Sequence, residues 1–179
     1  MRKTVLRAIV TAVFALPLLA AAGQAARLEN PYFSHWASLP VGKEVTGLGE
    51  TRSIDGVKHY AWGHKLLEVH DDYVVLENER VSYDTNERTT KTIKLERYLG
   101  LRNLVEYGGT ENVTVNGQVY SCEKYTIRYF GDSGRESLRF EYWFHPDIPG
   151  FAKFVMPSLP GDDEEIAVSG TETAVMWTP

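Results

Sequence analysis

The sequence predicts a mainly β protein, an antiparallel meander of about eight strands that forms a curved sheet, half-barrel or barrel, with one short N-terminal helix. Two observations predict it. From Gly42 onward, strand-length runs rich in Val, Thr, Tyr, Ile and Phe are separated by compact turn signals such as Asp55-Gly56 and Asn116-Gly117. In addition, registering strands through these turns sets apolar residues opposite one another, as a buried sheet face requires.

Residues 1–26 have the pattern of a secretory signal peptide. A basic start precedes an apolar run, Ala8–Ala22, and the segment ends in small residues at Ala25-Ala26. We therefore expect a periplasmic or secreted protein in which residues 27–179 form a single antiparallel β domain. No later segment is apolar enough to span a bilayer, which predicts that the processed chain is not an integral membrane protein. No cysteine follows the apolar run to carry a lipid.

The next segment, Pro31–Leu39, is expected to form the short helix. Asn30 can cap it and Pro31 suits its first position, where the missing N–H has no partner to lose. Tyr32, Trp36 and Leu39 follow at helix-like spacing, so we expect one or two turns that pack an aromatic face on the sheet.

The first strands can be registered through their turns. A two-residue turn at Asp55-Gly56 sets Gly49 opposite Trp62 and Gly47 opposite His64, and glycines opposite bulky rings indicate a curved sheet. Turns at Asp71-Asp72 and Thr85-Asn86 then predict one apolar row across three strands, made of Leu67, Leu76 and Leu95.

The second half of the meander is organised around residues 111–156. Loops are expected at Gly100–Asn103 and Gly108-Gly109 before it, and a last strand at Ile166–Trp177 after it. A loop at Gly131–Gly134 predicts one apolar face, with Tyr125 opposite Phe140 and Ile127 opposite Leu138. It predicts a second cluster on the other face, where Cys122 lies opposite Trp143 and Tyr120 opposite His145.

Composition and cysteine content narrow the classes of partner. The net charge of −5 and the lack of a basic run argue against a nucleic-acid partner. Cys122 is the only cysteine, so no intrachain disulfide can form. Its place between Tyr120 and Lys124 in a strand favours a shielded thiol over a site of intermolecular pairing.

No catalytic residue, metal site or cofactor site is predicted. The five histidines have no metal-ligand spacing, and the acidic stretch Asp162–Glu165 lacks the alternating acids and glycine of a calcium loop. Ser133 lies between glycines but before a strand, which is typical of a hairpin tip and not of a nucleophile elbow.

Aromatic surface remains as the candidate for function. A single sheet with one short helix must either close on its own core or present a concave apolar face to a ligand. The predicted ligand-binding residues are those of the apolar face and of the second cluster: Trp62, Tyr125, Ile127, Phe140, Tyr120, Trp143 and His145.

The pattern of signal peptide, aromatic helix, long antiparallel meander and proline-broken return resembles small exported bacterial proteins and, more loosely, the LolA/LolB-type half-barrels. No specific motif is matched, the lipid-bearing cysteine of LolB is absent, and the two-helix lid of a LolA-like carrier is not evident. The resemblance implies a non-enzymatic protein that binds an apolar or acyl ligand. The alternative is a structural protein of the cell envelope that pairs with a protein partner through exposed strand edges.

Overall fold

The computed structural model describes residues 27–159 and 169–177. The predicted signal peptide at residues 1–26 and the acidic stretch Asp162–Glu165 lie outside the described residues. In the part of the chain that is described, no helix is long and apolar enough to cross a membrane.

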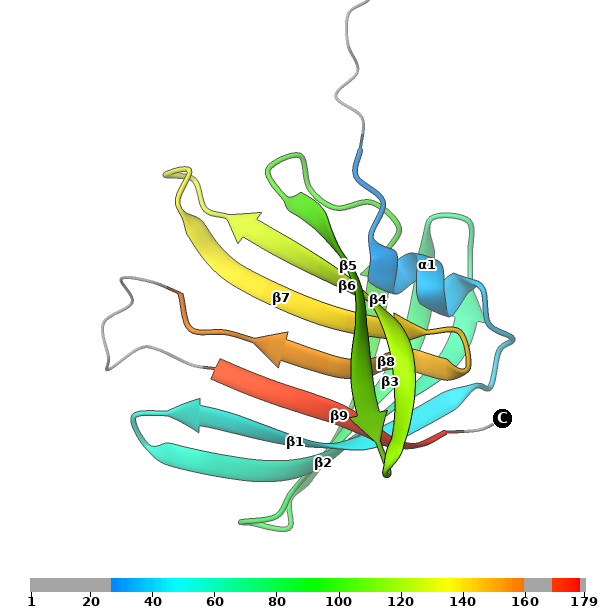
Figure 1. Cartoon of the computed structure of the whole chain (residues 1–179), viewed down its shortest axis with the longest axis vertical. Helices are drawn as coiled ribbons and strands as arrows, with labels where there is room; N and C mark the ends of the chain where they lie inside the picture. Colours follow the sequence, from blue (N-terminus) through cyan, green and yellow to red (C-terminus); the bar gives the residue numbers. More distant parts are fainter. Residues whose placement is uncertain (1–26, 160–168, 178–179) are drawn as a thin grey trace, which may run out of the picture.

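The described residues form a single antiparallel sheet with one short helix, which confirms the predicted class (Figure 1). The elements are α1 (Pro31–Ala37), β1 (Glu44–Ser53), β2 (Gly56–Val69), β3 (Tyr73–Ser82), β4 (Arg88–Glu96), β5 (Leu104–Val115), β6 (Gln118–Phe130), β7 (Glu136–His145), β8 (Ile148–Met156) and β9 (Ser169–Trp177).

The strand order is β4-β3-β2-β1-β9-β8-β7-β6-β5, so β9 lies between two meanders and joins them. The sheet is open and strongly curved. In Figure 1, β3 and β4 cross behind β8 and β9, whereas the β5–β6 hairpin crosses in front of them. Arg80 on β3 donates a hydrogen bond to Glu172 on β9 at 3.0 Å, across the two strands that separate them, because the sheet bends inward there.

Helix α1 begins where the sequence predicts. The Asn30 side chain accepts a hydrogen bond from the Tyr32 amide at 3.1 Å, and Pro31 occupies the first turn. Trp36 is fully buried, and the Tyr32 ring stacks on Tyr142 of β7 with centroids 5.2 Å apart. We call the sheet face that carries α1 the inner face and the opposite one the outer face.

The β5–β6 hairpin covers part of the outer face. Trp143 follows Tyr142 in the same strand and therefore points to the outer side, where its indole N–H donates to Glu111 of β5 at 2.9 Å. At the hairpin tip, the Asn116 amide donates to the Val175 carbonyl of β9. Cys122 has no exposed surface, so the prediction of a shielded thiol is confirmed.

The predicted register of β1 and β2 is wrong by two residues. The turn consists of Ile54 and Asp55, and among residues 53–56 only Gly56, which follows the turn, has a positive φ, +110°. A type I′ turn at Asp55-Gly56 needs two such residues, whereas one glycine after the turn suits a G1 bulge. Glycines still face bulky rings, with Gly47 opposite Trp62 and Gly49 opposite Tyr60.

The predicted leucine row is also shifted. A bulge between Leu66 and Glu68 brings Leu66, not Leu67, opposite Leu76. On the other side, Leu76 meets Ile93 instead of Leu95, since Ser82 bonds to Glu87 around a longer loop.

In the second half, the Asn116-Gly117 turn is confirmed, with φ of 52° and 78° at its two residues. The loop predicted at Gly108-Gly109 is wrong, because β5 continues through these glycines with a bulge. Between β6 and β7, a bulge near Phe130 shifts the pairing by two residues, so that Ile127 lies opposite Phe140 and Tyr125 opposite Tyr142. A shift of two keeps every side chain on its predicted face.

Candidate ligand-binding face

The inner face is built on two glycines of β1. A Cβ atom on Gly49 would lie 2.5 Å from the Tyr60 ring, and one on Gly47 would overlap the Trp62 indole and the Thr173 carbonyl. Because glycine has no side chain at these two positions, the rings of Tyr60 and Trp62 on β2 can lie flat across β1. The Trp62 indole is fixed there by a 3.2 Å hydrogen bond to the Leu48 carbonyl.

Three aromatic rings continue from this core along the inner face. Phe140 on β7 is 5.4 Å from Tyr129 on β6 and 5.4 Å from Phe154 on β8, centroid to centroid. We call these three residues the aromatic run. Each is only partly buried, whereas the neighbouring Tyr142 is covered by Tyr32 of α1. The helix therefore covers one end of the concave face and leaves the aromatic run partly open to solvent.

A buried hydrogen-bond network marks the end that the helix covers. His64 bonds through Nδ1 to the Tyr32 hydroxyl at 3.0 Å and through Nε2 to the Asn78 amide at 2.5 Å. Because Asn78 donates to Nε2, neutral His64 carries its proton on Nδ1 and donates to Tyr32. Burial lowers the pKa of His64 to about 4, so the ring is neutral near pH 7.

A second polar cluster borders the aromatic run. Glu172 of β9 accepts from the Tyr60 hydroxyl at 2.8 Å and from the Arg80 guanidinium at 3.0 Å, and Arg80 lies 4.0 Å above the Tyr60 ring. Burial raises the pKa of Glu172, and the two donors partly oppose that rise. We call Tyr60, Arg80 and Glu172 the polar corner.

The structure brings four of the predicted ligand-binding residues together on the inner face. Trp62 is 3% exposed and Ile127 is 1% exposed, so both are sealed in the core. Phe140 is part of the aromatic run. Tyr125 contacts Phe144 beside α1, with ring centroids 5.9 Å apart.

The other three predicted residues do not form one site. Pairing of β6 with β7 ends at Glu123 and Phe144, so the predicted pairs of Cys122 with Trp143 and Tyr120 with His145 are wrong. Trp143 is buried under the hairpin, with the ammonium groups of Lys124 and Lys153 each 4.7 Å from its ring. Tyr120 still reaches His145, edge to face at 5.1 Å.

An open groove runs between α1 and β6. It consists of two adjoining hollows of about 410 and 630 Å³ that share His35, Ser38, Glu123 and Phe144. Tyr125 lines the first hollow and His145 the second. His35 stacks on Phe144 at 5.1 Å and is bonded to the Ile148 carbonyl at 2.8 Å. Burial lowers the pKa of His35, which favours its neutral form.

Sequence reasoning missed the polar corner and two rings of the aromatic run. The alternation of Tyr125, Ile127 and Tyr129 could have identified Tyr129. Nothing local links Arg80 to Glu172, because their contact depends on the curvature of strands far apart in the chain. Within residues 27–159 and 169–177, no group of three or more His, Cys, Asp or Glu side chains could hold a metal ion.

No model of a known protein family matches the chain, and no curated protein matches it. Among solved structures, it is similar to one from Vibrio parahaemolyticus described as an outer membrane lipoprotein-sorting protein domain. That similarity has a TM-score of 0.42 and 8% identity over 77% of this chain and 85% of the other. It is also similar to a DUF1329 family protein from Desulfovibrio piger, with a TM-score of 0.24 and 11% identity over 79% and 85%.

The first neighbour is of the lipoprotein-sorting kind that the sequence resembles. At these scores and identities, neither similarity carries an argument about function, which must come from this chain's own side chains.

Proposed function

We propose that the protein is an exported, non-enzymatic protein that binds an apolar or acyl ligand on the inner face of its curved sheet. The observation that carries the proposal is the aromatic run. Tyr129, Phe140 and Phe154 form contiguous rings on a concave face and are left partly open to solvent beyond the helix. Contiguous exposed apolar surface on a concave face is typical of a ligand site.

The chemistry of the surface favours a flexible apolar chain over a compact polar ligand. Rings from three adjacent strands offer faces and edges to methylene groups, and each buried methylene contributes about 0.8 kcal/mol. The groove beside α1 is a separate surface, because the buried Tyr142 lies between Phe144 and Phe140 under Tyr32. A ligand can lie along the three rings of the aromatic run without displacing the core.

Titration of the purified protein with a fluorescent fatty acid tests the proposal. Wild type should bind the probe, and Phe154→Ala should weaken binding roughly 5- to 30-fold, as expected for the loss of about 1–2 kcal/mol of apolar contact. Tyr83→Ala is the matched control, because this ring is 52% exposed in the loop after β3 and should leave the affinity unchanged. Equal affinities in wild type and both variants would contradict the proposal.

Native mass spectrometry of protein purified from its own host gives an independent reading. A co-purifying lipid supports the proposal. A ligand-free protein that also fails to take up the probe would overturn it and favour the alternative predicted from the sequence, a protein partner in the cell envelope.

Export and domain organisation are part of the same proposal. The signal-like pattern of residues 1–26 supports cleavage after Ala26, leaving residues 27–179 as one domain. Intact-mass measurement of the protein from a periplasmic extract should find a chain that begins at Arg27. Full-length protein retained in the cytoplasm would contradict export.

A further inference from the structure

The polar corner lies directly beside the aromatic run. Glu172 on β9 is the register partner of Phe154 on β8, and both lie on the inner face. Arg80 reaches the same place from β3, since its guanidinium donates to Glu172. A ligand that lies on the rings of Phe154 and Phe140 therefore ends next to the guanidinium of Arg80.

The guanidinium of Arg80 is both fixed in position and open to solvent. Glu172 and the face of the Tyr60 ring hold it, yet the Arg80 side chain is 52% exposed, whereas that of Glu172 is 9% exposed. The Arg80 guanidinium has five N–H donors, and its described hydrogen bond, to Glu172, uses only one of its terminal nitrogens. The remaining donors are positioned without further ordering of the side chain, which lowers the entropic cost of binding an acceptor.

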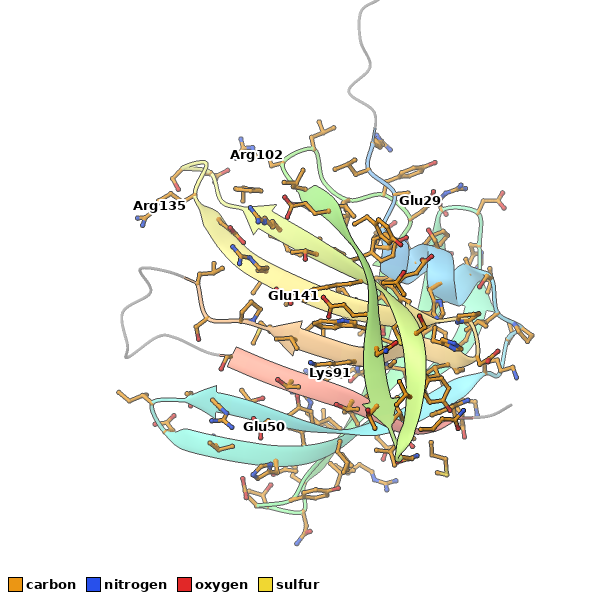
Figure 2. All side chains as sticks on the ribbon, in the orientation of Figure 1. Glu29, Glu50, Lys91, Arg102, Arg135 and Glu141 are labelled. Atoms are coloured by element: carbon orange, nitrogen blue, oxygen red, sulfur yellow. The ribbon has the colours of Figure 1, made fainter. Side chains whose placement is uncertain are left out.

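A second cation stands next to Arg80. Lys91 on β4 is the register partner of Asn78, whose side chain bonds to His64 on the inner face, so Lys91 projects to that face as well. Figure 2 shows Lys91 behind β8 and β9, on the side where β3 and β4 curl around the sheet. Lys91 is exposed and has no ion pair within the described parts of the chain. Arg80 lies two residues after Asn78, at the distance of a diagonal cross-strand neighbour of Lys91.

We propose that Arg80 and Lys91 bind the anionic head group, a carboxylate or a phosphate, of an acyl ligand whose chain lies on the aromatic run. The inference rests on the proposed function and names its ligand class, an anionic amphiphile. A guanidinium matches the geometry of either acid with two parallel N–H donors, and the Lys91 ammonium adds a mobile point charge. Glu172 holds the Arg80 guanidinium in position, because the Glu172 carboxylate is itself buried and accepts a hydrogen bond from Tyr60.

The test compares three probes that share one alkyl chain, namely dodecanoate, dodecyl phosphate and dodecanol, by isothermal titration of the purified full chain. We expect at least one anionic probe to bind about tenfold tighter than dodecanol at low salt, an advantage that should shrink as the salt concentration rises. The stronger of the two anions identifies the head group.

Lys91→Gln should reduce that advantage about two- to threefold. Lys94→Gln is the matched control, because Lys94 lies on the same strand but on the outer face, paired with Glu96. Arg80→Gln should have a larger effect than Lys91→Gln. If it leaves the buried Glu172 without a cationic partner and the protein fails to fold, the double variant Arg80→Gln/Glu172→Gln removes both charges together.

The outcomes separate the inference from the function it rests on. If all three probes bind equally and Lys91→Gln changes nothing, the head-group site is refuted while binding of acyl chains stands. If none of the probes binds to wild type, the proposed function fails as well.

Discussion

Replacement of Gly47 by alanine tests the packing on which the inner face depends. The added methyl group would lie within 3.0 Å of both the Thr173 carbonyl oxygen and the Trp62 indole. Neither can move away cheaply. The carbonyl belongs to the backbone of β9, and the indole is bonded to Leu48 and packed on Phe151 with ring centroids 4.8 Å apart.

Overpacking of this kind costs about 1–3 kcal/mol, and the backbone contact places Gly47→Ala near the upper end. Replacing glycine also stabilises by about 0.5–1 kcal/mol through the unfolded chain, so we expect a net loss of about 2–2.5 kcal/mol. For a chain of this size, that loss lowers the melting temperature by about 5–10 °C.

Gly63→Ala provides the matched control for this prediction. Gly63 lies next to Trp62 in β2, and a Cβ there would be 3.5 Å from the nearest atom, the Thr46 methyl, which is ordinary contact. This variant should be as stable as wild type or slightly more stable. Urea unfolding followed by tryptophan fluorescence measures both variants. If Gly47→Ala and Gly63→Ala are equally stable, the Trp62 indole does not pack directly against the backbone of Gly47.

Three further predictions concern buried groups. Burial raises the pKa of Cys122 to about 11, so a thiol reagent at about pH 8 should label the protein only after unfolding, and rapid labelling of the native state would contradict its burial. Tyr32→Phe should cost about 1–2 kcal/mol in urea unfolding by removing the bond to His64, whereas Tyr83→Phe at an exposed site should cost less than about 0.5. Because burial lowers the pKa of His64 to about 4, below its unfolded value of about 6.5, its neutral form contributes stability above about pH 6.5. That contribution, about 3 kcal/mol, should be lost as the pH falls towards 4, and a wild type that changes no more than His64→Gln between these pH values would refute it.

Strand identity and the two faces of each strand could be predicted from the sequence, because alternation and turn residues are local signals. The capped helix at Asn30, the turn at Asn116-Gly117 and the buried Cys122 follow from such signals, and the structure confirms all three. The pairing register between neighbouring strands was predicted less well. Bulges at Leu67 and near Phe130 each shift the pairing, and a bulge depends on the twist of the whole sheet more than on the residues beside it.

The candidate site was predicted only in part for a similar reason. Tyr125 and Phe140 could be placed on the apolar face from one hairpin alone. Arg80 and Glu172 meet across strands that come together only when the sheet curls, so no window of the sequence contains their contact. The second cluster, around Trp143, does not form as predicted, because β6 stops pairing with β7 at Glu123 and Phe144 and continues beside β5 alone.

The position of β9 has a consequence for how the chain acquires its structure. The strands β1–β4 can pair as soon as they exist, and so can β5–β8, but among the described strands β9 provides the hydrogen-bonded link between the two groups. Until Ser169–Trp177 is available, β1 and β8 each present an unpaired edge, which is the kind of edge that recruits other chains into aggregates. Completion of the concave face is therefore a late, long-range event. Pairing of β9 with both β1 and β8 joins two aggregation-prone half-sheets into a single sheet.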